Sequence, residues 1–278
     1  MKNTPLSFRA AKGRQKLAML TCYDYSMARL MADTGLDALL VGDSLGMVML
    51  GYEDTVSVTL EEMIQHCAAV ARGAGDCLVV CDMPFLSSQC GVEDTVRNAG
   101  RLVKEGRAQA VKLEGGAAFA PEIAALVRAS IPVMGHIGLT PQSVNCLGGF
   151  KVQARDLEAA STLLSDAVAL EKAGAFALVL ECVPDAVAAM LTATVSIPVI
   201  GIGAGPHCDG QVLVWQDMLN VTGRKPKFVR AFADVGDVMR QAFADYKSAV
   251  ASGAFPADAE SYHMDPDIAR QLASRAKA

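Results

Sequence analysis

The stretch TLEEMIQHCAAVARGAGDCLVVCDMP, residues 59–84, places an amphipathic helix directly before a short apolar strand. Thr59 and Glu62 have the spacing of a capping box, which predicts that a helix begins just after Thr59. Apolar residues recur on one face of this segment as far as Ala74. The run CLVVC, residues 77–81, is apolar throughout, which is typical of a strand buried on both faces of a parallel sheet.

The same unit of strand and helix recurs along the chain. A second clear helix is predicted over Leu157–Ala173, with Gly174 in the position after a helix end that favours glycine. Short apolar runs predict the strands, which are expected at Leu17–Thr21, Ala38–Gly42, Cys77–Cys81, Ala110–Leu113, Pro132–Gly135, Ala177–Leu180, Pro198–Ile202 and Lys227–Arg230.

These alternating units predict an α/β protein with the architecture of a (β/α)8 barrel, also called a TIM barrel, and a helical tail after about Phe232. An open, doubly wound sheet is compatible with the same alternation and remains the alternative. No linker divides the chain, so residues 1–278 are expected to form one catalytic domain.

Composition and charge exclude several classes of protein. The chain is 52% hydrophobic and 20% charged, which indicates a globular protein with a large core. Its net charge of −5 argues against a nucleic-acid partner. The apolar stretches end well short of the ~18 residues that a membrane span needs, so no membrane association is expected.

The cysteines and the N-terminus bear on the cellular compartment. The chain has eight cysteines and no CxxC pair, which fits a reducing, cytoplasmic setting better than disulfides or a zinc site. The basic segment from Lys2 to Lys16 is compatible with an organellar transit peptide. It lacks a clear amphipathic face and runs directly into a predicted strand, so we disfavour that interpretation.

Ionisable side chains interrupt the apolar pattern at one place in each unit. They stand at the carboxyl ends of five successive predicted strands, and they are Asp43, Asp82, Lys112, Glu114, His136 and Glu181. In a barrel, the carboxyl ends of the strands form the face where active sites assemble. The repeated placement therefore predicts an active site, although any single one of these residues could instead cap a helix or pair with a surface charge.

The spacing within one strand sharpens this prediction. Lys112 and Glu114 are two residues apart and therefore point to the same side of their strand. Because the strands would be neighbours, Asp43, Asp82 and Glu114 are expected to converge. Three close carboxylates repel one another unless a cation neutralises them, and oxygen ligands favour Mg²⁺. His136 is as compatible with a structural, hydrogen-bonded role as with catalysis.

Three further segments have alternative interpretations. The motif GIGAG, residues 201–205, resembles a dinucleotide loop, but its third glycine is out of register. Its glycines could bind phosphate or let the backbone approach a ligand. His207 and Cys208 have no second ligand pair, so a loop role is preferred to metal binding. The segment from Ser44 to Val58 reads as a long loop that serves either as a lid or as a contact with a neighbouring subunit.

Several long motifs resemble those of the ketopantoate hydroxymethyltransferase family, and the similarity extends from about Leu6 to His263. The motifs are MLTCYD (19–24), VGDSLGMVMLGYEDTVSVTLEEMIQH (41–66), VKLEGG (111–116), GHIGLTPQSVNCLGGFKVQ (135–153), LVLECVP (178–184) and IPVIGIGAGPHCDGQVLV (197–214). The resemblance implies a barrel of the phosphoenolpyruvate mutase and isocitrate lyase type. It also implies transfer of a hydroxymethyl group from methylenetetrahydrofolate to 3-methyl-2-oxobutanoate, which forms 2-dehydropantoate on the route to pantothenate.

The resemblance also implies roles for individual residues. Asp43, Asp82 and Glu114 correspond to the Mg²⁺ carboxylates, and Asp43, Ser44, Asp82 and Lys112 to contacts with the substrate. Glu181 corresponds to the proton acceptor, and His136 to an active-site histidine. The reaction would pass through an enolate that Mg²⁺ stabilises, and the family's assembly would be a homodecamer.

The sequence is also compatible with two functions other than hydroxymethyl transfer. The first is a related Mg²⁺-dependent barrel that cleaves a carbon–carbon bond in a 2-oxo or 2-hydroxy acid without folate. The second is a barrel that binds a ligand without catalysis. The second predicts loss of a metal-site carboxylate, yet Asp43, Asp82 and Glu114 are all present.

Overall fold

Eight parallel strands close into a barrel in the computed structural model, which describes residues 2–223 and 225–276. Each strand pairs with the next in chain order, and the last pairs with the first. The strands are β1 (Leu17–Thr21), β2 (Ala38–Val41), β3 (Leu78–Asp82), β4 (Ala110–Glu114), β5 (Val133–Gly138), β6 (Ala177–Glu181), β7 (Val199–Ile202) and β8 (Gly210–Leu213). The predicted barrel is confirmed, and an open doubly wound sheet is excluded.

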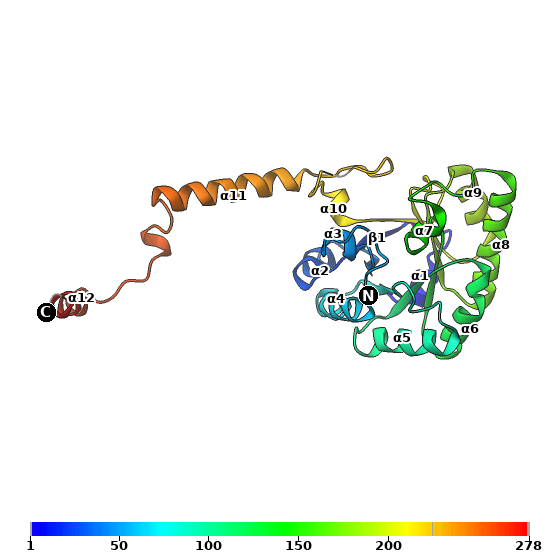
Figure 1. Ribbon diagram of the computed structural model, residues 1–278, viewed down its shortest axis with the longest axis horizontal. Coiled ribbons are helices and arrows are strands. Elements are labelled where there is room, and N and C mark those ends of the chain that lie inside the picture. The colour runs from blue at the N-terminus through cyan, green and yellow to red at the C-terminus, as the bar shows by residue number, and fades with distance from the viewer. Residues whose placement is uncertain (1, 224, 277–278) are drawn as a thin grey trace.

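Helices surround this barrel and connect its strands (Figure 1). The long helices that follow β1 to β6 are α2 (Tyr25–Ala32), α4 (Leu60–Gly73), α5 (Val92–Lys104), α6 (Ala120–Arg128), α8 (Leu157–Ala173) and α9 (Asp185–Thr194). Shorter helices in the loops are α3 (Leu45–Val48), η1 (Ala117–Phe119), η2 (Pro141–Ser143), α7 (Val144–Leu147) and α10 (Trp215–Met218). Helix α1 (Pro5–Ala10) precedes the barrel, and the tail contains α11 (Val235–Ser252), η3 (Asp258–Glu260) and α12 (Pro266–Arg275).

The two helices predicted in most detail are confirmed, together with the signals that delimit them. Thr59 Oγ1 accepts a hydrogen bond from the backbone N–H of Glu62 at 3.2 Å, and Glu62 Oε2 accepts one from the N–H of Thr59 at 2.8 Å. This capping box satisfies two N–H groups that the first turn of α4 would otherwise leave unpaired. Gly174 ends α8 in the left-handed conformation, with φ of 104°.

The apolar core lies in two layers, one inside the barrel and one between the strands and the outer helices. Helix α1 contributes Phe8, which packs edge-on against Phe176 with ring centroids 5.9 Å apart. Nearby, Lys12 Nζ lies 2.7 Å from Asp209 Oδ2. Part of the basic N-terminal segment thus packs onto the barrel. A transit peptide would not be expected to form part of the fold in this way.

The predicted eighth strand is wrong. Lys227–Arg230 lies in a turn and irregular chain, whereas β8 is Gly210–Leu213 and pairs with both β7 and β1. Strict alternation led to the error, because a parallel crossover usually takes a dozen residues or more and contains a helix. Here the short segment 203–209 connects β7 to β8 without a helix.

The segment from Ser44 to Val58 is also more ordered than expected, because it contains the short helix α3. Tyr52 Oη donates a 2.6 Å hydrogen bond to Glu62 Oε1, which ties the segment to α4. The expectation of a segment without helix is therefore wrong in part. Its predicted use as a lid or as a subunit contact stays a prediction.

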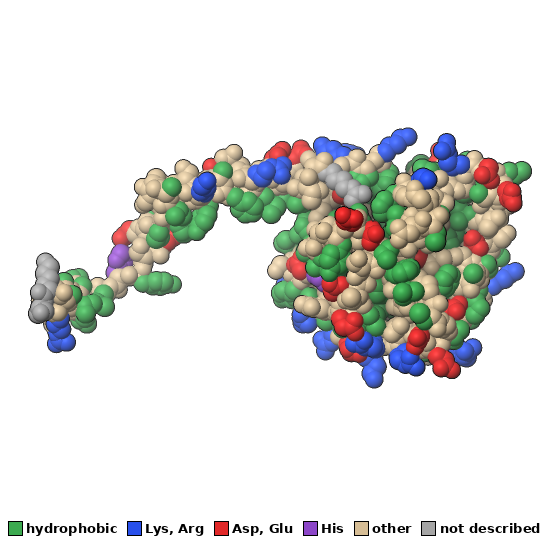
Figure 2. Space-filling model, in the orientation of Figure 1, with side chains coloured by type: hydrophobic (Ala, Val, Ile, Leu, Met, Phe, Trp, Pro, Cys, Tyr) green, Lys and Arg blue, Asp and Glu red, His purple; other side chains and the backbone are tan. Residues whose placement is uncertain are grey.

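The expected helical tail is confirmed, and it extends away from the barrel (Figure 1). Figure 2 shows hydrophobic side chains along the tail. Those with large exposed surfaces include Val238, Met239, Phe243, Tyr246, Val250, Ile268 and Leu272.

Two findings concern the broader expectations from composition. All eight cysteines are free thiols, and five of them are buried. None of the helices in residues 2–223 and 225–276 combines the length and apolar content needed to cross a bilayer.

Candidate active site

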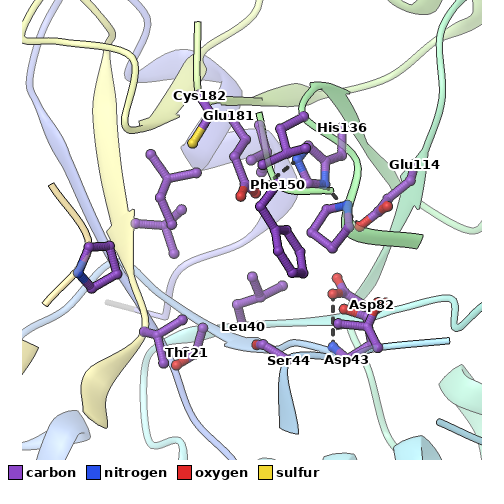
Figure 3. Close-up of a pocket in the computed structure, with 18 of the residues that line it drawn as sticks. Thr21, Leu40, Asp43, Ser44, Asp82, Glu114, His136, Phe150, Glu181 and Cys182 are labelled. Atoms are coloured by element: carbon purple, nitrogen blue, oxygen red, sulfur yellow. Dashed lines mark hydrogen bonds and ion pairs between the residues drawn. The ribbon is translucent and has the colours of Figure 1, made fainter. Parts of the chain in front are cut away.

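One cavity of ≈ 320 Å³ lies at the carboxyl ends of the strands and takes in every side chain that the sequence singled out for the site. These residues are Asp43, Ser44, Asp82, Lys112, Glu114, His136 and Glu181. Figure 3 shows Glu181 across the cavity from Ser44, with His136 and Glu114 beside Glu181 and Asp43 beside Ser44. Neighbouring strands of a closed barrel bring these side chains together, although they are far apart in the sequence.

Strand β4 supplies two of the charged groups, as its period of two residues predicts. Lys112 and Glu114 are both buried and line the cavity, and Lys112 Nζ lies 3.3 Å from Glu114 Oε1. The same ammonium lies 3.3 Å from Asp82 Oδ1 on the adjacent strand β3. One cation therefore sits between carboxylates of two strands.

The two aspartates are linked through the backbone. The N–H of Asp43 donates a 3.0 Å hydrogen bond to Asp82 Oδ2, and both side chains are buried. Asp82 Oδ1 has no hydrogen-bond partner within the described part of the chain, although Lys112 is near. Asp82 therefore has one oxygen fixed by an N–H donor and one oxygen that faces a charge.

Burial and charge act in different directions on the three carboxyl groups. Burial raises the pKa of Asp43, and the charges of Glu114 and Asp82 raise it further. Burial also raises the pKa of Asp82, and Lys112 offsets this effect only in part. Burial opposes ionisation of Glu114 as well, but Lys112 and His136 outweigh it and hold its pKa below the usual range. The two aspartates are therefore the carboxyl groups whose ionised forms the surrounding protein compensates least.

Lys112 stays protonated in this environment. Burial alone would lower its pKa, but Asp82, Glu114 and Asp43 surround the ammonium and raise it instead. Burial and Lys112 likewise lower the pKa of His136, whereas Glu114 and Glu181 raise it to about 9.

The position of Lys112 indicates where the imidazole of His136 carries its proton. Lys112 Nζ lies 2.8 Å from His136 Nδ1, and a hydrogen bond at this distance requires an unprotonated Nδ1. In this arrangement the ring N–H is at Nε2, 3.3 Å from Glu181 Oε2, whereas Glu114 and Glu181, which raise the pKa of His136, favour a second proton at Nδ1. A second proton at Nδ1 would require Lys112 Nζ to move away.

Glu181 differs from the other acids in its exposure. Its side chain is 16% exposed, whereas the Glu114 side chain is 2% exposed. It ends β6 and lines the cavity, so it combines access to a bound molecule with a neighbouring imidazole. These are properties that a general base requires.

Ser44 lines the cavity beside the aspartates and is held by a buried tyrosine. Its Oγ lies 2.9 Å from Tyr23 Oη, and the Tyr23 side chain is fully buried. Tyr23 was not predicted as part of the site, because it follows β1 and is uncharged, so no ionisable group interrupts the apolar pattern there.

Gln142 is a second residue that the sequence analysis missed. It lies in η2, and its side chain donates a 2.8 Å hydrogen bond to Asp43 Oδ2. The sequence offered one indication of its role: Gln142 is a polar residue in the loop that follows β5, the strand that carries His136. Apolar residues of the cavity wall, such as Phe150, Val152 and Phe228, were also not predicted.

The donor set meets the chemical needs of a divalent metal through its carboxylate oxygens. No group of three His, Cys, Asp or Glu side chains in the described residues is arranged to hold an ion. Lys112 and Gln142 lie among the carboxylates. Asp43 and Asp82 nevertheless supply hard oxygen donors whose charge is poorly compensated, and this chemistry suits Mg²⁺. Direct ligation by Glu114 would require it to turn from Lys112.

The GIGAG motif has a packing role in this structure. Gly203 and Gly205 adopt positive φ values of 64° and 79° in the short link between β7 and β8. A Cβ atom at Gly205 would come within 2.7 Å of Asp185 Cβ at the start of α9. Close packing therefore accounts for glycine at this position without a bound nucleotide.

Comparisons of the sequence with known proteins agree on one family. A sequence model of that family, described as ketopantoate hydroxymethyltransferase, matches residues 2–258. A 3-methyl-2-oxobutanoate hydroxymethyltransferase of Clostridium novyi (strain NT) is 57% identical over 98% of this chain and 100% of its own length. The enzyme of the same name from Enterococcus faecalis (strain ATCC 700802 / V583) is 56% identical over the same shares of the two chains.

Solved structures with similar architecture are more distant in sequence. A phosphonopyruvate hydrolase aligns with a TM-score of 0.63 at 12% identity, covering 99% of this chain and 97% of its own. A 2,3-dimethylmalate lyase, described as a member of the PEP mutase/isocitrate lyase superfamily, aligns with a TM-score of 0.59 at 15% identity, covering 100% and 96%. At these identities the likeness establishes the fold, which is the barrel type expected from the sequence.

Proposed function

This chain belongs to the ketopantoate hydroxymethyltransferase family, and on that premise we propose that it transfers a hydroxymethyl group from methylenetetrahydrofolate to 3-methyl-2-oxobutanoate, forming 2-dehydropantoate. Relatives named for this activity match over nearly their whole length, so the chain is a hydroxymethyltransferase. The observation that carries the proposal is the convergence, in one cavity, of Asp43, Asp82, Lys112, Glu114, His136 and Glu181.

Charge complementarity supports a 2-oxo acid as the substrate. We propose that Lys112 and Ser44 contact its oxygens, because a buried ammonium and a hydroxyl line the cavity beside the aspartates. The ammonium is already fixed by Asp82 and Glu114, so little reorganisation is needed when an anion binds.

Asp43 and Asp82 are the residues that we propose to hold Mg²⁺, with Glu114 adding negative charge as the third carboxylate of the expected set. When bound, Mg²⁺ would supply positive charge for the carboxylate and ketone oxygens of the oxo acid and for the charge that develops as C3 loses its proton.

We propose that Glu181 removes the proton from C3 of the oxo acid. Its partial exposure lets it reach a molecule in the cavity, and His136 Nε2, 3.3 Å from its Oε2, orients it. The deprotonated carbon then bonds to the methylene carbon of the folate, and water supplies the hydroxyl group. Both C–N bonds of that methylene carbon break, and the proton from C3 and one proton from water go to the two nitrogens of the departing tetrahydrofolate. The apolar side chains of Phe150, Val152 and Phe228 offer the folate ring a surface at the cavity wall.

Assembly, domain organisation and compartment complete the proposal. We propose one catalytic domain over residues 1–278 and a cytoplasmic homodecamer. The exposed apolar side chains of the tail would be buried in such an assembly, and the free thiols fit a reducing compartment. Native mass spectrometry measures the number of subunits directly, and a monomer at micromolar concentration would contradict the decamer.

Product analysis tests the function. The purified protein is incubated with Mg²⁺ and 3-methyl-2-oxobutanoate, with and without methylenetetrahydrofolate, and the products are followed by NMR. We expect 2-dehydropantoate only when the folate is present. Consumption of a 2-oxo or 2-hydroxy acid without folate would favour the lyase alternative, and no turnover in either mixture would contradict catalysis.

A further inference from the structure

Gln142 connects the segments that carry Asp43, Asp82 and Glu114, the three carboxylates of the proposed Mg²⁺ site. The residue is 5% exposed and lies in η2, just after β5. Its Nε2 donates hydrogen bonds to Asp43 Oδ2 at 2.8 Å and to the carbonyl oxygen of Met83 at 2.9 Å. Its backbone N–H donates to Glu114 Oε2 at 3.1 Å. A single residue thereby joins the chain after β2, after β3 and at the end of β4.

These contacts use the whole donor capacity of the residue. A primary amide has two N–H bonds, and Asp43 and Met83 accept both of them. Unlike Lys112, the amide fixes an oxygen without adding a full positive charge. Asp43 is thus held in place by a neutral donor.

The two aspartates share a pattern of anchoring. Gln142 holds Oδ2 of Asp43, and the backbone N–H of Asp43 holds Oδ2 of Asp82. Oδ1 of Asp82 makes no hydrogen bond among the described residues, although Lys112 Nζ lies 3.3 Å from it. In each carboxylate one oxygen is fixed by an N–H donor, which leaves the other to act as a single-oxygen ligand. In metal sites, residues that hydrogen-bond to a ligand but do not touch the metal commonly orient that ligand.

We infer that Gln142 is a positioning residue that fixes Asp43 and Glu114 for a divalent cation. The inference rests on the proposed Mg²⁺ site and adds a residue to it. Gln142 itself need not touch the ion, because both N–H bonds of its amide already point to protein acceptors.

The competing interpretation is that Gln142 only closes the loop after β5 over the barrel. Both interpretations predict some loss of stability when the amide is removed, because Asp43 and Met83 would lose a buried hydrogen-bond donor. Only a positioning role predicts a specific loss of metal affinity, so metal binding distinguishes the two.

The test uses Gln142→Met in the full chain. Methionine keeps the length of the side chain and removes both N–H donors, while the backbone N–H to Glu114 remains. Mg²⁺ alone is titrated into the variant and the wild type by calorimetry, without oxo acid. We expect the Kd for Mg²⁺ to rise about 10- to 100-fold, as for other residues that orient metal ligands. Saturating Mg²⁺ should restore most of the kcat, which a general structural defect would not allow.

Gln89→Met is the matched control. Gln89 Nε2 lies 3.4 Å from Gln142 Oε1, so this variant also removes a neighbouring amide but leaves the bonds to Asp43 and Glu114 in place. Its Kd for Mg²⁺ should equal that of the wild type. If thermal unfolding shows that Gln142→Met does not fold, Gln142→Asn replaces it, since the shorter amide cannot reach Asp43 and should weaken Mg²⁺ binding in the same way.

The possible failures are distinguishable. If the wild type binds Mg²⁺ and the folded Gln142 variant binds it equally well, the inference is wrong and the proposed metal site stands. If the wild type binds no Mg²⁺, the proposed metal site is wrong and the inference is overturned with it.

Discussion

The imidazole Nε2 of His136 lies 3.3 Å from Oε2 of Glu181. The other ring nitrogen lies 3.2 Å from Glu114 Oε1, so this histidine joins the acidic cluster on β4 to the partly exposed acid on β6. The register of the sheet accounts for this contact, because His136 pairs with Glu114 on one side and with Val179, two residues before Glu181, on the other. Two acids with different exposure can therefore serve different roles in one cavity.

Glu181→Gln should separate proton transfer from substrate binding. The amide is nearly isosteric with the carboxylate but is a poor base, so Mg²⁺ and 3-methyl-2-oxobutanoate should still bind. Exchange of the C3 proton with deuterated water, followed by NMR without folate, should slow by about 10² to 10⁴-fold. Exchange at the wild-type rate would show that another group removes the proton.

Lys112→Met should impair both substrate binding and turnover. Methionine keeps much of the apolar stem but removes the ammonium that lies 3.3 Å from Asp82 and from Glu114. The negative charge then lacks its internal partner, so an anionic oxo acid should bind more weakly. Steady-state kinetics should show a higher KM and a lower kcat.

A lysine at the other end of the barrel provides the control for this variant. Lys12 pairs with Asp209 at 2.7 Å, away from the cavity, and Lys12→Met should lower stability without changing KM. If Lys112→Met behaves in the same way, the ion pairs of Lys112 are structural only.

Asp82→Ala should weaken Mg²⁺ binding and activity together. The substitution removes Oδ2, which accepts a hydrogen bond from the N–H of Asp43. It also removes Oδ1, which has no hydrogen-bond partner in the described chain. Calorimetric titration of Mg²⁺ in the presence of the oxo acid measures the effect. An unchanged affinity would remove Asp82 from the metal site.

The sequence predicted the charged part of the site because strand periodicity governs it. Buried parallel strands are apolar, so Asp82 and Glu114 stand out where each strand ends, and the period of two residues places Lys112 beside Glu114. Gln142 lies beyond the strand in η2, where neither period applies. Its contacts depend on how the loop folds back over β2 and β3, which a local pattern does not encode.

The fold prediction failed at the eighth strand. A helix was expected between each pair of parallel strands, so Lys227–Arg230 was predicted as the eighth strand. The observed eighth strand is Gly210–Leu213. The short link from β7 is possible because Gly203 and Gly205 adopt positive φ values within it and Gly205 packs closely on α9. Backbone freedom at particular glycines, and not hydrophobic periodicity, determined that connection.

Gly138 is expected to control the position of Glu181 through the backbone. It ends β5 with φ of 93°, and a Cβ atom there would lie 2.3 Å from the carbonyl oxygen of Glu181. Because the atom in the way is a backbone oxygen, which cannot rotate aside, Gly138→Ala forces β5 and β6 apart next to Glu181, the proposed general base. We expect a loss of about 1 to 3 kcal/mol in the free energy of unfolding. A shift of Glu181 by ~1 Å can lower kcat by about 10²-fold.

Gly100→Ala is the matched control for this last prediction, because it makes the same chemical change at a site without the steric conflict. Gly100 lies within α5, and no atom lies within 4 Å of the Cβ that alanine would add. Alanine in a helix interior should raise the free energy of unfolding by roughly 0.5 to 1 kcal/mol. Chemical denaturation and steady-state kinetics measure both variants. Equal kcat values in Gly138→Ala and the wild type would show that the backbone can yield there without displacing Glu181, and the predicted link between β5 and the base would be wrong.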